Sequence, residues 1–332
     1  MGMPPRWRLG AGLFMVLILL IGMKIGMAVA SDSARVQLPG ENYVDRGLTP
    51  ARALVLGAVE GLTEYLPVSS TGHLLMAERL MGLYGTADVP GGQRRQAKTA
   101  ADAYAICIQG GAILAVLGLY ARRVRQMFLG LVGRDASGLK LAVNLGIAFL
   151  PAAVIGLLVG DLVKRYLFGP WPIVIAWLVG GLAILGMARW QRSSEGTRPQ
   201  KALEELDRKM ALLIGLVQCV AMWPGVSRSL ATIAGGVLVG LSLPAAVEFS
   251  FLLGVVTLGA ATGYDALKHG QDMLRLFDGS SIALGVISAF LFAVISVRWM
   301  VSYLTRHDIA IFGYYRIAVA VAAGFLMLTG RL

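Results

Sequence analysis

Charged residues are scarce in this sequence of 332 residues. Lys, Arg, Asp and Glu together make up 15% of the chain, whereas a soluble globular domain carries about 25%. Hydrophobic residues make up 57%, and they gather in runs long enough to cross a bilayer as helices. These runs lack the strict alternation of a lipid-facing β-barrel. The composition therefore excludes an ordinary soluble domain and predicts an all-α, polytopic protein of the lipid bilayer.

Cysteine and acidic residues are scarce as well. The two cysteines, Cys107 and Cys219, lie far apart in apolar segments, which excludes a disulfide framework or a CxxC metal motif and predicts buried free thiols. Asp and Glu number 19 against 30 Lys and Arg, for a net charge of +11. The basic residues cluster at residues 122–125 and 189–209. This is the positive-inside pattern of cytoplasmic loops, not a nucleic-acid site.

The N-terminal segment has two interpretations. Arg6 and Arg8 precede an apolar run at residues 9–23, and Ala28-Val-Ala30 precedes Ser31. This pattern is typical of a cleaved signal peptide, but an uncleaved extra transmembrane helix over residues 1–30 fits it equally well. In both cases residues 31–48 form an external linker, and residues 49–332 form the integral membrane domain.

Within that domain, the apolar pattern predicts about eight helices plus two short, interrupted segments. The interrupted segments cover residues 49–66, broken at Pro67, and residues 211–222, broken at Trp223-Pro224-Gly225. Such segments are typical of re-entrant or broken helices that line a binding site. The clearest spans are at residues 101–120, 139–159, 171–188, 244–264, 282–303 and 309–328, and the polar residues 90–99 predict a loop.

The first interrupted segment runs into a stretch rich in reactive groups, Glu60-Gly-Leu-Thr-Glu-Tyr-Leu-Pro-Val-Ser-Ser-Thr-Gly-His73. Glu60 and Glu64 are four residues apart, so both point to one face of a helix. Like charges in an apolar setting require a positive partner, either a divalent cation or an arginine. Ser69, Ser70 and Thr71 follow the proline break, where helix caps and phosphate-binding amides are expected.

The second interrupted segment carries an arginine in the motif Pro224-Gly-Val-Ser-Arg-Ser229. The planar fork of Arg228 suits bidentate binding of phosphate, and the hydroxyls of Ser227, Ser229 and Thr232 add donors around it. The two segments also align with each other, Gly57 and Glu60 with Gly215 and Gln218, and Ser69-Ser70 with Ser227-Arg228. We therefore expect the two motifs to form one site for phosphoryl transfer.

These two motifs resemble those of the undecaprenyl-diphosphatase (bacitracin-resistance) family. The resemblance runs from about residue 49 to the C-terminus, and leaves the N-terminal segment as an addition. It also includes Ile108-Gln109, Glu248-Phe-Ser-Phe-Leu-Leu253 and Tyr315-Arg316.

The resemblance implies a specific activity and architecture. The activity is removal of the terminal phosphate from undecaprenyl diphosphate, which recycles the lipid carrier for peptidoglycan synthesis. The architecture is an inverted repeat with two re-entrant segments, in a homodimer whose active site faces outward from the bacterial plasma membrane. A divalent cation, Mg²⁺ or Ca²⁺, is implied. The family's functional residues fall on Glu60, Glu64, Ser70, His73 and Arg228.

Several roles remain open on the residues alone. Ser70 is the expected nucleophile, with His73 as its proton partner three residues on. In the competing mechanism, water attacks, activated by Glu64 or His73, and Ser70 only binds phosphate or caps a helix. Glu248 and Arg316 either support the site or lie at helix ends. The alternative function is a transporter or flippase for a polyprenyl phosphate, because broken helices are also common in transporters.

Overall fold

A computed structural model gives the fold of residues 48–81, 83, 91–193, 200–276 and 278–330. The predicted signal peptide or extra helix, and nearly all of the predicted linker, lie outside these residues. The described part is helical, as the composition predicts, and its single β-type pairing is an isolated bridge between Lys201 and Leu241.

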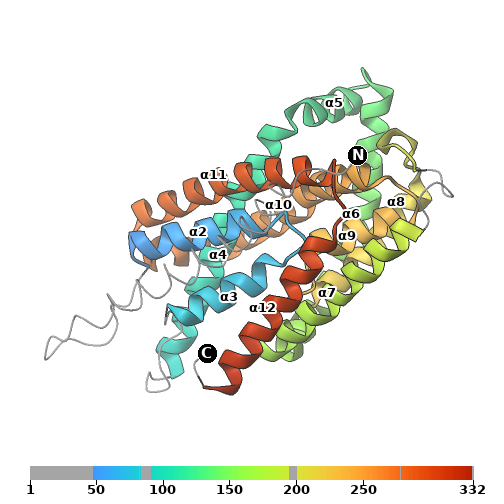
Figure 1. Cartoon of the computed structure of the whole chain (residues 1–332). Coiled ribbons are helices and arrows are strands. Elements are labelled where there is room, and N and C mark those ends of the chain that lie inside the picture. The colour runs from blue at the N-terminus through green and yellow to red at the C-terminus, as the bar shows by residue number, and fades with distance from the viewer. Residues whose placement is uncertain (1–47, 82, 84–90, 194–199, 277, 331–332) are drawn as a thin grey trace, which may run out of the picture.

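Eleven α-helices and two 3₁₀ turns make up the described residues (Figure 1). In chain order they are α2 (Pro50–Thr63), α3 (Ser70–Leu80), α4 (Gly91–Leu119), α5 (Ala121–Leu131), α6 (Ala136–Leu167), α7 (Pro170–Ser193), η1 (Leu203–Glu205), α8 (Arg208–Gln218), η2 (Cys219–Met222), α9 (Arg228–Leu238), α10 (Leu243–Leu276), α11 (Gly279–Leu304) and α12 (Ala310–Leu328).

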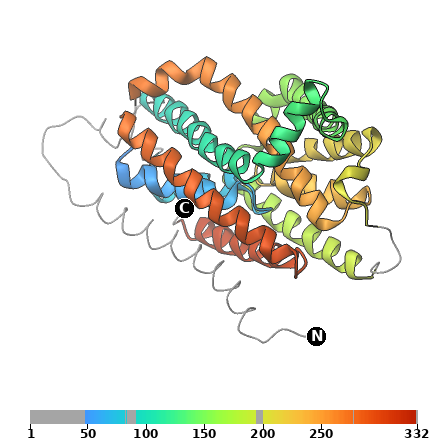
Figure 2. The same cartoon turned by 90° about the horizontal axis from the view of Figure 1, so that it is seen from above.

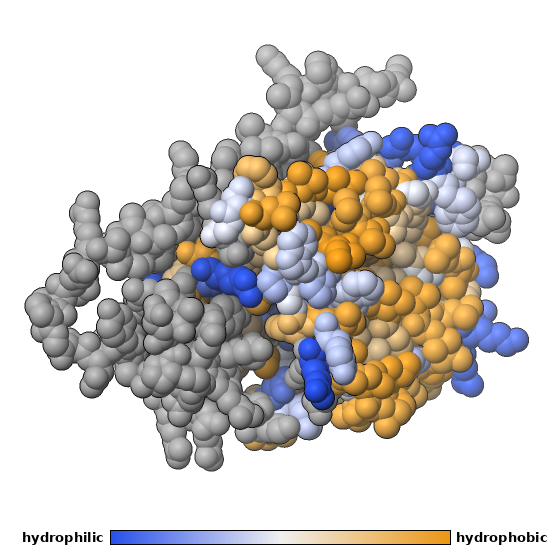
Figure 3. All heavy atoms as spheres, turned by 90° about the horizontal axis from the view of Figure 1, so that it is seen from below, coloured by the Kyte–Doolittle hydropathy of each residue, from blue (hydrophilic) through white to orange (hydrophobic). Residues whose placement is uncertain are grey.

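Five of these helices are long and apolar enough to cross a membrane, namely α6, α7, α10, α11 and α12. The bent pair α4 and α5 makes a sixth if it counts as one span. This is fewer than the eight predicted helices, but it makes the chain a multi-pass membrane protein. Apolar side chains cover most of the described surface on the face in Figure 3, and strongly hydrophilic ones gather mainly toward its rims.

Two segments predicted as loops are helical. Residues 91–99 form the first turns of α4, because Gln, Arg, Ala and Lys are good helix formers despite their polarity. The basic residues at 122–125 lie on α5, which is bent by 81° from α4 and runs across one end of the molecule in Figure 1. Hydropathy alone detects neither feature, because it reports burial in lipid and not helical conformation.

The broken segment α2 packs along α11, and both α4 and α2 use glycines to approach that helix closely. Figure 2 shows α11 beside α4 and α2. A Cβ on Gly57 or Gly61 would collide with backbone atoms of α11. Ser296 on α11 donates a hydrogen bond of 2.8 Å to the Gly61 carbonyl. Small residues and interhelical hydroxyls are how helices associate in lipid, where no hydrophobic effect drives them together.

We expect Gly61→Ala to destabilise the protein, because its added methyl group meets Ala289 and Ala293 of α11. Overpacking of this kind costs about 1–3 kcal/mol. Gly118→Ala is the matched control, since Gly118 is an exposed helical glycine with no atom within 4 Å of a built Cβ. Thermal unfolding in detergent should show a lower Tm for Gly61→Ala alone. Equal Tm values would contradict the close-approach argument.

Candidate functional site

The first break lies between α2 and α3. Helix α2 ends at Thr63, and Glu64 is its C-cap, so the helix stops before Pro67 and three residues earlier than the predicted Leu66. The chain then turns through Val68 to Ser69, which has φ of 75°. A positive φ is uncommon outside glycine and marks a conformation that the surrounding structure must enforce.

The second break, between η2 and α9, repeats this geometry. Ser227 has φ of 78°, and Ser69 and Ser227 are the described residues other than glycine with positive φ. Each serine is the N-cap of an 11-residue helix, which starts at Ser70 in one case and at Arg228 in the other. The backbone therefore bears out the alignment of Ser69-Ser70 with Ser227-Arg228 that the sequence predicts.

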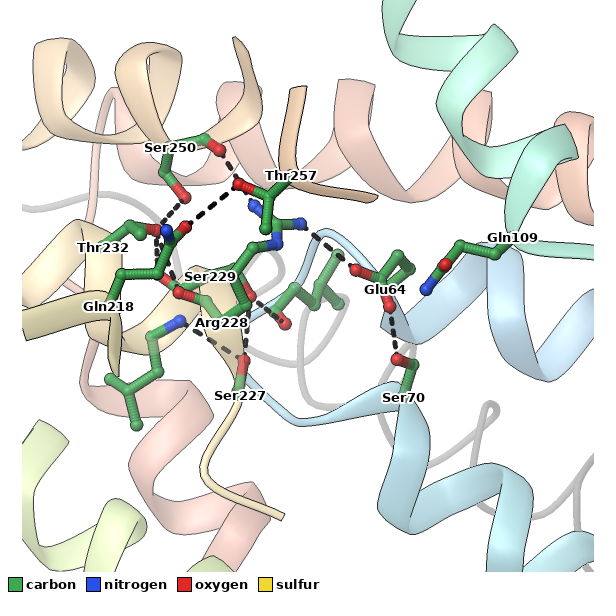
Figure 4. Close-up of polar contacts among 12 residues, drawn as sticks. Glu64, Ser70, Gln109, Gln218, Ser227, Arg228, Ser229, Thr232, Ser250 and Thr257 are labelled. Carbon is green, nitrogen blue, oxygen red and sulfur yellow. Dashed lines mark hydrogen bonds and ion pairs between the residues drawn. The ribbon is translucent and has the colours of Figure 1, made fainter. Parts of the chain in front are cut away.

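The two breaks meet at Glu64. Arg228 donates from Nη2 to Glu64 Oε1 at 3.1 Å, and Glu64 is buried while the Arg228 side chain is only 10% exposed. The Ser70 hydroxyl donates to the other carboxylate oxygen, Oε2. Figure 4 shows Glu64 between Ser70 on one side and Arg228 on the other. A second link joins the breaks where Ser229 donates to the Leu66 carbonyl at 2.7 Å.

Glu60 lies one helical turn before Glu64 and is buried. Its Oε1 atom has no hydrogen-bond partner among the described residues. Of the two positive partners that the sequence allows, the structure supplies an arginine for Glu64. Glu60 retains a buried carboxylate oxygen that no described residue satisfies, so this oxygen is an acceptor available to a ligand.

Neither ring nitrogen of His73 bonds to the Ser70 hydroxyl, in contrast to the predicted proton-transfer pair. Its Nδ1 lies 2.7 Å from the Ser69 carbonyl oxygen, and its Nε2 lies 2.8 Å from the Tyr315 hydroxyl. A carbonyl only accepts hydrogen bonds, so Nδ1 carries a proton. In the neutral ring Nε2 then accepts from Tyr315. Spacing along a helix predicts which residues are neighbours, but not where an imidazole finds its partners.

The predicted phosphate-binding hydroxyls have different placements. Ser229 bonds to the Leu66 carbonyl as described above. The Oγ atoms of Ser227 and Ser229 lie 2.9 Å apart. Thr232 donates to the Arg228 carbonyl and lies 2.6 Å from Ser250 Oγ. These three hydroxyls therefore hold the second break together. Ser69 makes no side-chain capping bond, and Thr71 is exposed at the start of α3.

Several residues near the site were assigned no individual role from the sequence. The Arg228 guanidinium lies over the Tyr65 ring, 5.4 Å from its centroid, and its Nη1 donates to the Ser250 carbonyl at 2.9 Å. A Cβ at Gly254 would collide with that guanidinium, so this glycine makes room for it. Gln109 points from α4 toward Glu64 in Figure 4. The sequence features that could have indicated Ser250 and Gln109 are the motif at residues 248–253 and the pair Ile108-Gln109.

Comparison with known proteins agrees with this geometry. The family model described as "Bacitracin resistance protein BacA" matches residues 53–322, which include both breaks. This chain belongs to that family. An undecaprenyl-diphosphatase from Sorangium cellulosum is 43% identical over 271 residues, covering 80% of this chain and 83% of the relative. A relative from Rhodospirillum rubrum named undecaprenyl-diphosphatase 2 is 44% identical, covering 80% and 91%.

Glu248 and Arg316, whose roles the sequence leaves open, have different surroundings in the structure of this family member. Glu248 accepts from Arg123 Nε at 2.7 Å, and Arg123 Nη2 reaches Glu204 at 2.8 Å. The bond from Arg123 lowers the pKa of the Glu204 carboxyl below its ordinary value. This network joins α5, α10 and η1 and includes neither Glu64 nor Arg228. Arg316 lies inside α12, fully buried, and not at a helix end.

We expect Glu64→Gln to lower stability strongly, because it leaves the buried Arg228 charge without its counter-ion. Removing one partner of a buried pair costs about 3–5 kcal/mol. Glu204→Gln is the matched control at a partly exposed pair with Arg123, and such pairs contribute about 1 kcal/mol or less. Unfolding in detergent should therefore separate the two variants. An unchanged Tm in Glu64→Gln would show that the ion pair does not hold the breaks together.

Proposed function

We propose that this chain is an undecaprenyl-diphosphatase, which hydrolyses undecaprenyl diphosphate to undecaprenyl phosphate and inorganic phosphate. The relatives at 43% and 44% identity carry that name, and the family name connects the activity with bacitracin resistance. The observation that carries the proposal is the meeting of Ser70 and Arg228 on one carboxylate. This contact supports the proposal, because a hydroxyl, a carboxylate and a guanidinium suit the roles of nucleophile, base and phosphate-binding cation.

In the proposed reaction, Ser70 attacks the terminal phosphorus. Glu64 accepts the Ser70 proton, since it already accepts its hydrogen bond, and this activates an otherwise weak nucleophile. The bond from phosphorus to the bridging oxygen breaks, its electron pair leaves with undecaprenyl phosphate, and the proton held by Glu64 passes to that leaving oxygen. Water then cleaves the phosphoserine, releases phosphate and returns a proton to Ser70. In the competing mechanism, water activated by Glu64 or His73 attacks the phosphorus directly.

Arg228 is proposed to stabilise charge on the transferred phosphoryl group. Its Nη1 and Nη2 contact Ser250 and Glu64, while its Nε has no partner among the described residues. A buried, unpartnered N–H on this guanidinium is a donor available to a phosphate oxygen. The bonds to Ser250 and Glu64 hold the planar fork in place before substrate binds. Ser69, Thr71 and Ser227 complete the proposed phosphate contacts.

We propose that the site binds a divalent cation, with Glu60 as its main protein ligand. Its unpartnered Oε1 is an oxygen donor of the kind that Mg²⁺ and Ca²⁺ prefer. Glu64 shares its oxygens with Ser70 and Arg228. The described residues contain no cluster of three or more His, Cys, Asp or Glu that could hold a metal. Further ligands would come from diphosphate and water, as is usual for Mg²⁺. The cation would neutralise negative charge on the diphosphate.

We further propose that the two breaks are re-entrant segments of an inverted repeat, which enter the membrane from opposite sides. The matched φ values of Ser69 and Ser227, and the equal lengths of the helices that follow them, α3 and α9, support this arrangement. The basic residues of α5 and residues 189–209 are proposed to face the cytoplasm. The active site then opens to the outer face of the bacterial plasma membrane, where recycling of the lipid carrier serves peptidoglycan synthesis. A homodimer is proposed on the family resemblance.

The direct test is phosphate release from undecaprenyl diphosphate by purified protein in detergent, with no membrane gradient. We expect multiple turnovers by the wild type and a loss to background in Ser70→Ala. Ser193→Ala, an exposed serine on α7, is the matched control and should stay active. Absence of release, together with movement of a polyprenyl phosphate across vesicles, would favour a transporter and overturn the proposal.

Removal of divalent cations should abolish phosphate release, and added Mg²⁺ or Ca²⁺ should restore it. Glu60→Gln removes the proposed ligand charge, so this variant should need more metal for half-maximal rate. Glu204→Gln, which changes an exposed carboxylate that bonds to Arg123 and to neither break, should show the metal dependence of the wild type. A full rate after exhaustive chelation would rule out the metal.

A further inference from the structure

Arg316 is a fully buried arginine whose partners are backbone carbonyl groups. A guanidinium has five N–H donors and no acceptor. Arg316 makes five hydrogen bonds, one from Nε and two from each Nη atom, at distances between 2.8 and 3.3 Å. Every donor of this side chain is therefore used, which is how a charge in an apolar interior is kept satisfied.

The five carbonyls belong to three separate segments that surround the site. One is Pro67 in the first break, and two are Gly225 and Val226 in the second break. The remaining two are on α7, at Ala176 and Trp177. A single side chain on α12 therefore connects both breaks with a long membrane-spanning helix.

The bonded carbonyls are close in sequence to the reactive groups. Pro67 is three residues before Ser70, and Val226 is two residues before Arg228. A shift of either carbonyl therefore moves the attacking hydroxyl or the phosphate-binding guanidinium. The neighbouring residue, Tyr315, contacts His73 from the same helix.

The fit around this guanidinium is tight. A Cβ at Gly180 of α7 would collide with Nη2 of Arg316. The guanidinium therefore fits only because residue 180 is a glycine. Lysine could not replace it, since an ammonium has three donors at one point and cannot reach three segments.

We propose that Arg316 is a positioning residue that fixes the separation between Ser70 and Arg228. It acts through the backbone of the two breaks and does not touch the substrate. The role rests on the proposed phosphatase activity, and it predicts an effect on rate beyond that of lost stability. A misplacement of about 1 Å in reacting groups lowers a rate by about a hundredfold.

The first arm compares kinetics and stability in Arg316→Lys, Arg316→Met and Asn144→Ala. Asn144 is the control, because it is a buried polar residue that donates to the Leu206 carbonyl and has no hydrogen bond to either break among the described residues. We expect kcat of the folded Arg316 variants to fall about a hundredfold, with KM changed only a few-fold. Asn144→Ala should lower Tm but keep kcat. If Arg316→Met does not fold, Gly180→Ala displaces the guanidinium while keeping the arginine.

The second arm measures the separation of the two breaks without using activity. Spin labels at Thr71 and Val220, which are both exposed, would be attached after Cys107 and Cys219 are replaced by alanine. The distance distribution should be narrow in the wild-type and Asn144→Ala backgrounds and broad in Arg316→Met or Gly180→Ala. A narrow distribution in the Arg316 or Gly180 variant, or an unchanged kcat, overturns the positioning role. If the wild type itself releases no phosphate, the proposed function fails, and the distance measurement still decides the role of Arg316.

Discussion

The ion pair between Glu64 and Arg228 joins two broken helical segments that lie 164 residues apart in the chain. Neither charge could be buried alone in an apolar bundle at a tolerable cost. Each therefore requires the other, and their contact sets where the two breaks meet. Because Ser70 bonds to the same carboxylate, the contact that closes the fold also assembles the proposed reactive centre.

Broken helices in a membrane leave backbone groups without their usual partners. Here side chains from distant elements supply them. Ser229 bonds to the first break, and Arg316 bonds to both. The strained backbone at Ser69 and Ser227 persists within this network. These contacts connect the groups of the site to one another without any substrate, and such preorganisation is the condition for electrostatic stabilisation of a phosphoryl group without rearrangement.

The sequence predicts the broken segments well, because proline and glycine interrupt apolar runs in both halves at matching spacing. It also predicts that Glu64 needs a positive partner. It could not choose between a metal and Arg228, since that choice depends on a contact between distant segments. The pairing of His73 with Tyr315, 242 residues away, was missed for the same reason. The helices at residues 91–99 and 121–131 were missed because their polar residues do not stand out by hydropathy.

The most direct test of a reactive centre built on Ser70, Glu64 and Arg228 is the stereochemical course of hydrolysis at the terminal phosphorus. A substrate analogue made chiral at that atom with sulfur and an oxygen isotope would be hydrolysed in isotopically labelled water. Attack by Ser70 followed by water inverts the phosphorus twice, so the account predicts overall retention of configuration. Overall inversion would mean a single attack by water and would contradict Ser70 as the nucleophile.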